Sequence, residues 1–353
     1  MKQFIATIFM LCAVAAFGQR PPQLPVGSIL PIEKVSVHDP VMAKQGDTYY
    51  LFCTGMGISV WSSKDLRNWR KESPVFAQAP QWAVDTIPGF RGHIWAPDIS
   101  YHNGQYYLYY SVSAFGKNTS AIGVATNKTL DSASADFKWL DHGRVIQSYP
   151  GKTNWNAIDP NIITDKKGNA YMHFGSFWDG LKVVKLTADR LHTAEDVATI
   201  PTVASRKSKS SADNPPAVDN NPKDAGGNAI EAPFVFKKGD WFYYFASIDY
   251  CCKGENSTYK MIVGRSKSAV GPFLDREGKD LRYGGGTLVL QGDKSWHGVG
   301  HNSAYTFDGK DYLVFHGYDA ADRGISKLRI EPMTWDKAGW PVLNVAKETA
   351  AIQ

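Results

Sequence analysis

One short phrase recurs five times along the chain, a turn-forming glycine followed by a run of aromatic residues. Each copy resembles Gly104-Gln-Tyr-Tyr-Leu-Tyr-Tyr110, and the five copies begin at Gly46, Gly104, Gly168, Gly239 and Gly309. A glycine turn that leads into an aromatic run is typical of a β-hairpin. The glycines are 58, 64, 71 and 70 residues apart. Each phrase therefore marks one structural unit of similar length.

Five strand-rich units of similar length predict an all-β fold, a five-bladed β-propeller with one four-stranded sheet in each blade. A TIM barrel of this size needs eight helical patterns, and the sequence shows only a weak one near 186–200. A β-sandwich would leave the fivefold period unexplained. The competing explanation is that hairpins recur by chance in a β-rich chain, since 13% of the residues are aromatic.

The first 18 residues are typical of a secretory signal peptide, because Lys2 precedes an apolar run that ends at Phe17. We expect cleavage near Gly18 and Gln19, export to the periplasm or the medium, and a single catalytic propeller domain over 19–353. No other stretch is apolar enough to span a membrane. The net charge of +5 is spread over the whole length, which argues against nucleic acid as the main partner. We expect a monomer.

The mature chain keeps three cysteines, Cys53, Cys251 and Cys252, which are too few for a disulfide framework. The adjacent pair leaves two alternatives open, a vicinal disulfide or two thiols packed near each other. No histidine lies at zinc-binding spacing from the pair. The core must therefore be held together by packing.

An ionisable residue precedes each hairpin glycine by six to nine residues; the five are Asp39, Asp98, Asp159, Glu231 and His301. If each begins the innermost strand of its blade, the five side chains meet in one funnel at the propeller axis. The turns that follow each second hairpin strand return to the same face. They would form an aromatic and polar rim from 114–116, 176–178, 249–253 and 316–319.

Carboxylates gathered from separate blades raise one another's pKa, a cost that proteins tolerate mainly for function. Glycoside hydrolysis needs such a set, because one acid protonates the leaving oxygen while another carboxylate activates water. A metal-only site also fits an acidic cluster, although calcium sites usually draw their ligands from one local loop. Any single Asp-Pro is more often a structural turn, and the Trp95-Ala-Pro-Asp98 turn by itself accounts for Asp98.

Nearly all of the mature chain resembles family 43 of the glycoside hydrolases, five-bladed propeller enzymes that cleave arabinose- and xylose-containing polysaccharides with inversion. The family-level motifs are His38-Asp-Pro40, Trp95-Ala-Pro-Asp98, Ile158-Asp-Pro-Asn161 and Glu231-Ala-Pro-Phe234. The arabinanase branch of the family is indicated by Ser111-Val-Ser-Ala-Phe-Gly116, Gly175-Ser-Phe-Trp178, Asp249-Tyr-Cys-Cys-Lys-Gly254, Asn256-Ser-Thr-Tyr259 and Gly300-His-Asn-Ser303.

The resemblance implies a role for each matching residue. Asp39 would be the general base and Glu231 the general acid, and Asp159 would orient Glu231 and tune its pKa. His301 would match the family's axial histidine, which is associated with a bound calcium or sodium ion. The residues expected to bind substrate are His38, Trp95, Phe115, Asn156, Ser176, Trp178 and His316.

The function implied is that of a secreted endo-1,5-α-L-arabinanase acting on arabinan or arabino-oligosaccharides. One alternative is an exo-acting α-L-arabinofuranosidase or β-xylosidase of the same family. Another is a carbohydrate-binding propeller without catalysis, which the complete set of three carboxylates argues against. A polar, low-complexity stretch over 201–229 precedes Glu231, and it either borders the substrate groove or hangs as a loop.

Overall fold

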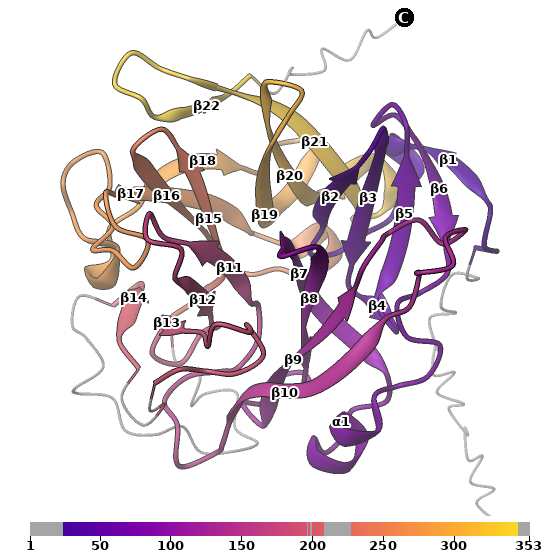
Figure 1. Ribbon diagram of the computed structural model, residues 1–353. Coiled ribbons are helices and arrows are strands. Elements are labelled where there is room, and N and C mark those ends of the chain that lie inside the picture. The colour runs from indigo at the N-terminus through magenta and orange to yellow at the C-terminus, as the bar shows by residue number, and fades with distance from the viewer. Residues whose placement is uncertain (1–23, 196, 198–199, 208–226, 345–353) are drawn as a thin grey trace, which may run out of the picture.

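The computed structural model describes residues 24–195, 197, 200–207 and 227–344. Their strands form five antiparallel sheets arranged as the blades of a β-propeller (Figure 1). The fold class predicted from the repeat is therefore confirmed. Within the described part of the chain, no helix has the length and apolar character needed to cross a membrane.

The blades follow one another along the chain. Blade one contains β1 (Ile29–Pro31), β2 (Val41–Gln45), β3 (Thr48–Cys53), β5 (Ser59–Ser63) and β6 (Asn68–Glu72). Blade two contains β4 (Gly55–Met56), β7 (His93–His102), β8 (Gln105–Val112), β9 (Ser120–Asn127) and β10 (Leu140–Ser148). Blade three contains β11 (Asn161–Thr164), β12 (Ala170–Phe174), β13 (Leu181–Lys185) and β14 (Thr202–Ala204).

Blade four contains β15 (Ile230–Lys238), β16 (Trp241–Ile248), β17 (Lys260–Ser266) and β18 (Thr287–Gln291). Blade five contains β19 (Trp296–Phe307), β20 (Lys310–Asp319), β21 (Ile325–Trp335) and β22 (Pro341–Leu343). The helices described are short: α1 (Gln81–Thr86), η1 (Ile32–Lys34), η4 (Gly254–Asn256), η5 (Leu281–Tyr283) and η6 (Ala320–Asp322). Where the weak helical pattern near 186–200 is described, over 186–195, the chain forms turns and an isolated bridge between Leu186 and Thr193.

All five repeated phrases form the hairpins that the sequence predicts. They join β2 to β3, β7 to β8, β11 to β12, β15 to β16 and β19 to β20. The five turn glycines have φ between 56° and 88°, a left-handed conformation that glycine adopts without a steric penalty. Chance recurrence of the phrase is therefore excluded, because each copy forms the corresponding hairpin of its own blade.

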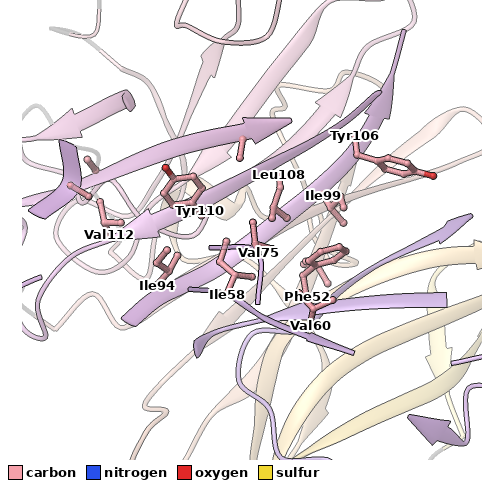
Figure 2. Packing of buried hydrophobic residues seen from close by; sticks show 14 of the residues in the cluster. Phe52, Ile58, Val60, Val75, Ile94, Ile99, Tyr106, Leu108, Tyr110 and Val112 are labelled. Atoms are coloured by element: carbon pink, nitrogen blue, oxygen red, sulfur yellow. The ribbon is translucent and has the colours of Figure 1, made fainter. Parts of the chain in front are cut away.

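The hydrophobic core lies between neighbouring blades. Figure 2 shows one of these clusters, in which Phe52 and Val60 of blade one pack near Ile99 and Leu108 of blade two. Equivalent clusters join each later pair of blades. A fifth cluster joins blade five back to blade one. The ring of blades is thus closed by packing.

Two expectations fall outside the described residues. The signal peptide over 1–18 lies there, and so does most of the polar stretch over 201–229, namely 208–226. Of the expected domain 19–353, the described ranges form the single propeller set out above.

Candidate active site

A left-handed residue stands in or just before the first strand of every repeated hairpin, which is β2, β7, β11, β15 or β19. These residues are Asp39, Ala96, Asp159, Ala232 and His301, with φ between 39° and 57°. Residues other than glycine rarely adopt this conformation, and those that do are held by their surroundings, often at functional sites. The five positions are therefore structurally equivalent.

This alignment corrects the expectation that five ionisable residues occupy equivalent positions around one funnel. Asp39, Asp159 and His301 do occupy the left-handed position. Glu231 precedes that position by one residue, and Asp98 follows it by two. Asp98 therefore leaves its strand at a different point from the three left-handed residues, beyond the place where the pairing register of β7 and β8 shifts.

Because of its different position, Asp98 does not belong to the site formed by the other ionisable residues. Its side chain is buried and accepts hydrogen bonds from Asn161 Nδ2 at 3.1 Å and from the Ile162 N–H at 2.8 Å, both in blade three. Burial raises the pKa of Asp98 to about 7. Asp98 thus ties blade two to blade three, as the structural interpretation of its turn predicts.

A ring of hydrogen bonds holds the five left-handed residues. The N–H of each donates to a side chain of the preceding blade: Asp39 to His316 Nδ1 (3.2 Å), Ala96 to Thr54 Oγ1 (2.8 Å), Asp159 to Ser111 Oγ (2.9 Å), Ala232 to Asp159 Oδ2 (3.2 Å) and His301 to Ser247 Oγ (2.8 Å). These bonds fix the backbone from which the functional side chains project.

Asp39 is held as a carboxylate. Its Oδ1 lies 2.9 Å from His301 Nδ1, and Thr54 donates its hydroxyl to Oδ2. Burial opposes the ionisation of Asp39, but the charge and hydrogen bond of His301 outweigh it and hold the pKa of Asp39 below its usual range. Burial would also lower the pKa of His301, yet the negative charge of Asp39 raises it to about 9. At neutral pH the pair is therefore an ion pair.

Glu231 has a hydrogen bond on each carboxyl oxygen. The hydroxyl of Tyr259 donates to Oε1 at 2.7 Å, and Ser176 Oγ donates to Oε2 at 2.8 Å. The backbones of Ser176 and Glu231 also form an isolated β-bridge. Tyr259 is buried, so the carboxyl group of Glu231 is fixed in orientation from two neighbouring elements.

Asp159 lies close enough to Glu231 for the two charges to interact. Burial raises the pKa of Asp159 to about 8; the negative charge of Glu231 adds to this rise, and the positive charge of His301 opposes it. A buried carboxyl group beside a negative charge keeps its proton to a higher pH than a solvent-exposed one. This side of the site can therefore supply a proton near neutral pH.

The two histidines expected to contact substrate lie at different depths. His38 is partly exposed and lies 4.5 Å from the ring of His316, centroid to centroid. His316 is fully buried, and its Nδ1 accepts the N–H of Asp39. Burial lowers the pKa of both rings. His316 therefore positions Asp39 through its backbone N–H. The segment 316–319, expected in a rim turn, belongs to the strand β20.

Phe115 and Trp95 are the more accessible of the expected aromatic contacts. Phe115 is 83% exposed in the turn between β8 and β9. A side chain so apolar and so exposed is available to stack on a sugar. Trp95 is partly exposed in β7, and its Nε1 donates to His93 Nδ1 at 3.0 Å. The contacts of both residues with sugar stay predictions.

Asn156, Ser176 and Trp178 are buried. Asn156 Oδ1 and Trp178 Nε1 have no hydrogen-bond partner within the described structure. Phe177, next to Trp178, is the more exposed aromatic residue of this turn, and its ring lies 6.1 Å from that of Tyr250. Ser176 acts on Glu231 directly, so its role here is to position the carboxyl group. A direct sugar contact of these three residues also stays a prediction.

Sequence reasoning missed several residues that position the carboxyl groups. One of them, Thr54, could have been found from its spacing in the sequence. A hydrogen-bonding residue stands seven or eight residues after each hairpin glycine; the five are Thr54, Ser111, Ser176, Ser247 and His316. Tyr259 belongs to a motif noted only as a mark of the family branch. Its ring explains Gly300, since a Cβ on Gly300 would lie 2.2 Å from the Tyr259 ring.

Comparisons with known proteins agree with this geometry. The family model "Glycosyl hydrolases family 43" matches residues 30–341. The chain is 50% identical to an extracellular exo-α-(1→5)-L-arabinofuranosidase of Cellvibrio japonicus, over 96% of this chain and 91% of the relative. It is 40% identical to an extracellular endo-α-(1→5)-L-arabinanase of Bacillus subtilis, over 86% of this chain and 87% of the relative.

A similar solved structure is that of a Cellvibrio cellulosa α-L-arabinanase in complex with arabinohexaose. It has a TM-score of 0.82 and 52% identity, and the alignment covers 88% of this chain and 96% of that one. A match of the family model over most of the chain, together with relatives of this identity, shows that the chain belongs to family 43 of the glycosyl hydrolases.

Proposed function

We propose that this enzyme hydrolyses α-1,5-L-arabinofuranosidic bonds in arabinan with inversion at the anomeric carbon. The observation that carries the proposal is the contrast between its two carboxyl sites. Asp39 is kept ionised by His301, whereas Asp159, which lies beside Glu231, has its pKa raised to about 8 and keeps its proton at neutral pH. An inverting glycosidase needs this combination of a base and an acid.

The chemical step assigns one task to each side. Glu231 donates its proton to the glycosidic oxygen, so that the bond to the anomeric carbon breaks with a neutral leaving group. Asp39 accepts a proton from a water molecule, whose oxygen forms the new bond from the opposite face. Tyr259 and Ser176 keep Glu231 in place, and His301 and Thr54 do the same for Asp39.

The choice of arabinan as substrate is supported by the relatives. Two curated relatives are named for α-(1→5)-linked L-arabinose, and a structural neighbour is described in complex with arabinohexaose. The resemblance of the sequence motifs to the arabinanase branch favours endo action. The identities favour exo action, because two relatives near 50% identity are named as exo enzymes, whereas two near 40% are named as endo enzymes.

A time course of the products from linear arabinan separates the two modes. Endo action gives a spread of oligosaccharides that shorten with time, whereas exo action releases one short product from the first minutes. An aryl arabinofuranoside adds a second test, because exo enzymes usually cleave it. If the protein leaves both substrates intact, the proposed hydrolysis is refuted, as expected for a propeller that only binds carbohydrate.

Inversion predicts that the first product carries the β configuration at its new reducing end. The reason is that water attacks opposite to the leaving group when base and acid flank the sugar. Proton NMR of the reaction, recorded before mutarotation, measures the anomer directly. An initial α signal would mean retention and would require a nucleophile other than Asp39.

We also propose a calcium or sodium ion at the propeller axis, held by His301. His301 Nδ1 contacts Asp39 Oδ1 at 2.9 Å, and metal-binding histidines usually have their second ring nitrogen on a carboxylate in this way. The remaining nitrogen, Nε2, would be the ligand atom, and binding of a cation there would release the proton that Nε2 carries in the ion pair with Asp39. A second group, His38, Asp39 and His316, has its potential ligand atoms within 4.8 Å of one another. A bound cation would supply positive charge and ordered water beside the carboxylates.

Removal of that ion is expected to lower the melting temperature or the activity, because a ligand that binds only the folded state stabilises it by mass action. The measurement is thermal unfolding and arabinan hydrolysis before and after chelation, followed by return of calcium. Elemental analysis of the untreated protein reports both ions. A protein that carries neither, and that chelation does not change, would contradict the ion site.

We propose export of the chain after cleavage near Gly18 and Gln19, since the names of both curated relatives describe extracellular enzymes. N-terminal sequencing of secreted protein tests the cleavage site. The monomeric state stays a prediction, which light scattering of the purified enzyme would measure.

A further inference from the structure

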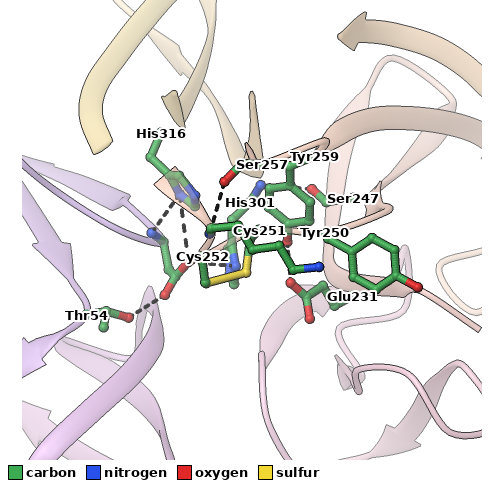
Figure 3. Close-up of a disulfide and its surroundings, with 12 residues drawn as sticks. Thr54, Glu231, Ser247, Tyr250, Cys251, Cys252, Ser257, Tyr259, His301 and His316 are labelled. Atoms are coloured by element: carbon green, nitrogen blue, oxygen red, sulfur yellow. Dashed lines mark hydrogen bonds and ion pairs between the residues drawn. A yellow bond between two sulfur atoms is a disulfide. The ribbon is translucent and has the colours of Figure 1, made fainter. Parts of the chain in front are cut away.

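The loop between β16 and β17 carries a disulfide between Cys251 and Cys252 (Figure 3). Of the two alternatives that the sequence left open, the vicinal disulfide is therefore the one present. Cys252 is exposed and Cys251 is partly exposed. Cys252 also has φ of 64°, a conformation that residues other than glycine keep only where the structure holds them, often at ligand clamps.

One side of this loop is anchored to the surroundings of the general base. The N–H of Cys252 donates to the hydroxyl of Tyr318 at 2.7 Å. The ring of Tyr318 packs edge-on against His38 at 5.6 Å and against His316 at 5.3 Å. These two histidines adjoin Asp39, in the sequence and through a hydrogen bond respectively.

The other side of the loop leads to the general acid. The N–H of Thr258 donates to the carbonyl of Tyr250 at 2.9 Å, which closes the loop at its base. The next residue is Tyr259, whose hydroxyl donates to Glu231. The disulfide thus sits in a short closed loop that has one anchor at Tyr318 and the other next to Tyr259.

Blade five packs closely against this loop. A Cβ on Gly324 would lie 2.3 Å from the backbone nitrogen of Glu255, so the turn after β20 packs directly against η4. A loop held at its base, at Tyr318 and at Gly324 presents the disulfide as a rigid surface. Rigid surfaces bind ligands with a smaller loss of conformational freedom than mobile ones.

The exposed chemistry of the loop suits the apolar face of a sugar ring. The two sulfurs are polarisable and largely apolar, and the bond between them fixes the intervening peptide. Tyr250, the preceding residue, is 43% exposed, and its ring lies 6.1 Å from that of Phe177 across blades three and four. Aromatic and sulfur surfaces together make a patch that can cover one face of a furanose.

We propose that the Cys251–Cys252 disulfide and Tyr250 form the wall of a sugar-binding subsite beside the point of cleavage. The proposal rests on the proposed function, because it names the arabinofuranose unit as the occupant. The disulfide determines how tightly the substrate binds, whereas the carboxyl groups perform the chemistry. Loss of the disulfide should therefore raise KM and leave kcat nearly unchanged.

The first test is kinetics on arabinotriose and arabinohexaose with three enzyme forms. They are the wild type, the wild type reduced with excess dithiol, and the double variant Cys251→Ser/Cys252→Ser. Reduction breaks the S–S bond and forms two thiols, while the dithiol gives up two electrons and two protons and closes to its own disulfide. We expect KM to rise about five- to tenfold in both altered forms, with kcat within about twofold of the wild type.

Two controls make this test specific. Reductant should not change the double variant, which lacks the target bond. Thiol titration of the folded protein should find two new thiols after reduction, because burial raises the pKa of Cys53 to about 11 and keeps that thiol unreactive.

A second variant, Tyr318→Phe, removes the hydroxyl that anchors Cys252 and should raise KM about two- to threefold. Its matched control, Tyr101→Phe, alters a 61% exposed tyrosine beside the blade-two hairpin and should not raise KM.

Each result decides the proposal. An unchanged KM after two thiols are titrated, or a fall in kcat and melting temperature without a rise in KM, would show that the disulfide only supports the fold. If the oxidised wild type left arabinan and its oligosaccharides intact, the proposed function itself would fail, and the subsite would fail with it. The two failures are distinguishable because only the second concerns the untreated enzyme.

Discussion

Replacement of Glu231 by Gln, or of Asp39 by Asn, is expected to lower the turnover of arabinan by about 10² to 10⁴-fold. Gln at 231 has no proton to give to the leaving oxygen, and Asn at 39 cannot accept one from water. Both substitutions conserve volume, so the fold should persist. The measurement is kcat on linear arabinan, with circular dichroism and the melting temperature as evidence of folding. A folded variant with turnover near that of the wild type would remove the assigned role from that residue.

Asp98→Asn is the matched control for these two variants. Asp98 belongs to the same repeated pattern, but it accepts two hydrogen bonds between blades two and three. An amide there presents a donor to one of those N–H groups, and an unsatisfied buried group costs about 1–3 kcal/mol. We expect a lower melting temperature with kcat close to that of the wild type below the unfolding transition. This contrast separates loss of chemistry from loss of stability.

The fold was predictable because its signal is local. A glycine turn and an aromatic strand lie within seven residues of each other, so the hairpins at Gly46 and Gly104 are visible without any knowledge of distant contacts. The number of blades then follows from the number of repeats. That Asp39, Asp159 and Glu231 lie close enough to interact was also predictable, since each stands in a short motif near one of those hairpins; their catalytic roles stay predictions.

The remainder of the site depends on contacts that no spacing reveals. Counting back from a hairpin glycine assumes an unbroken strand, yet the pairing register shifts between Trp95 and Asp98 and between Glu231 and Phe234. A bulge of this kind re-aims the side chains that follow it. The shift in β7 explains why the side chain of Asp98 lies outside the site. Tyr259 escaped notice for another reason, because its bond to Glu231 joins residues 28 positions apart in the chain.

Replacement of Asp159 by Asn is expected to lower kcat at neutral pH by about 10²-fold and to move the alkaline limb of the pH profile to lower pH. The sign follows from the proton on Asp159. In the wild type, burial and the charge of Glu231 raise the pKa of Asp159 to about 8, so Asp159 keeps its proton up to that pH. The variant has no group at this position that holds a proton to pH 8. The supply of a proton on this side of the site should therefore end at a lower pH.

The pair of variants Asp159→Asn and Asp159→Ala separates charge from position. The N–H of Ala232 donates to Asp159 Oδ2 at 3.2 Å, and the carbonyl oxygen of Asn can accept the same bond, whereas Ala cannot. If Asp159 acts through its charge, both variants show the displaced alkaline limb. If it acts only by holding the backbone next to Glu231, the Asn variant keeps the wild-type profile and Ala alone loses activity. The profile of kcat/KM between pH 5 and 10 in the two variants thus decides whether the proton on Glu231 is controlled by a neighbouring carboxylate or by the ring of hydrogen bonds between the blades.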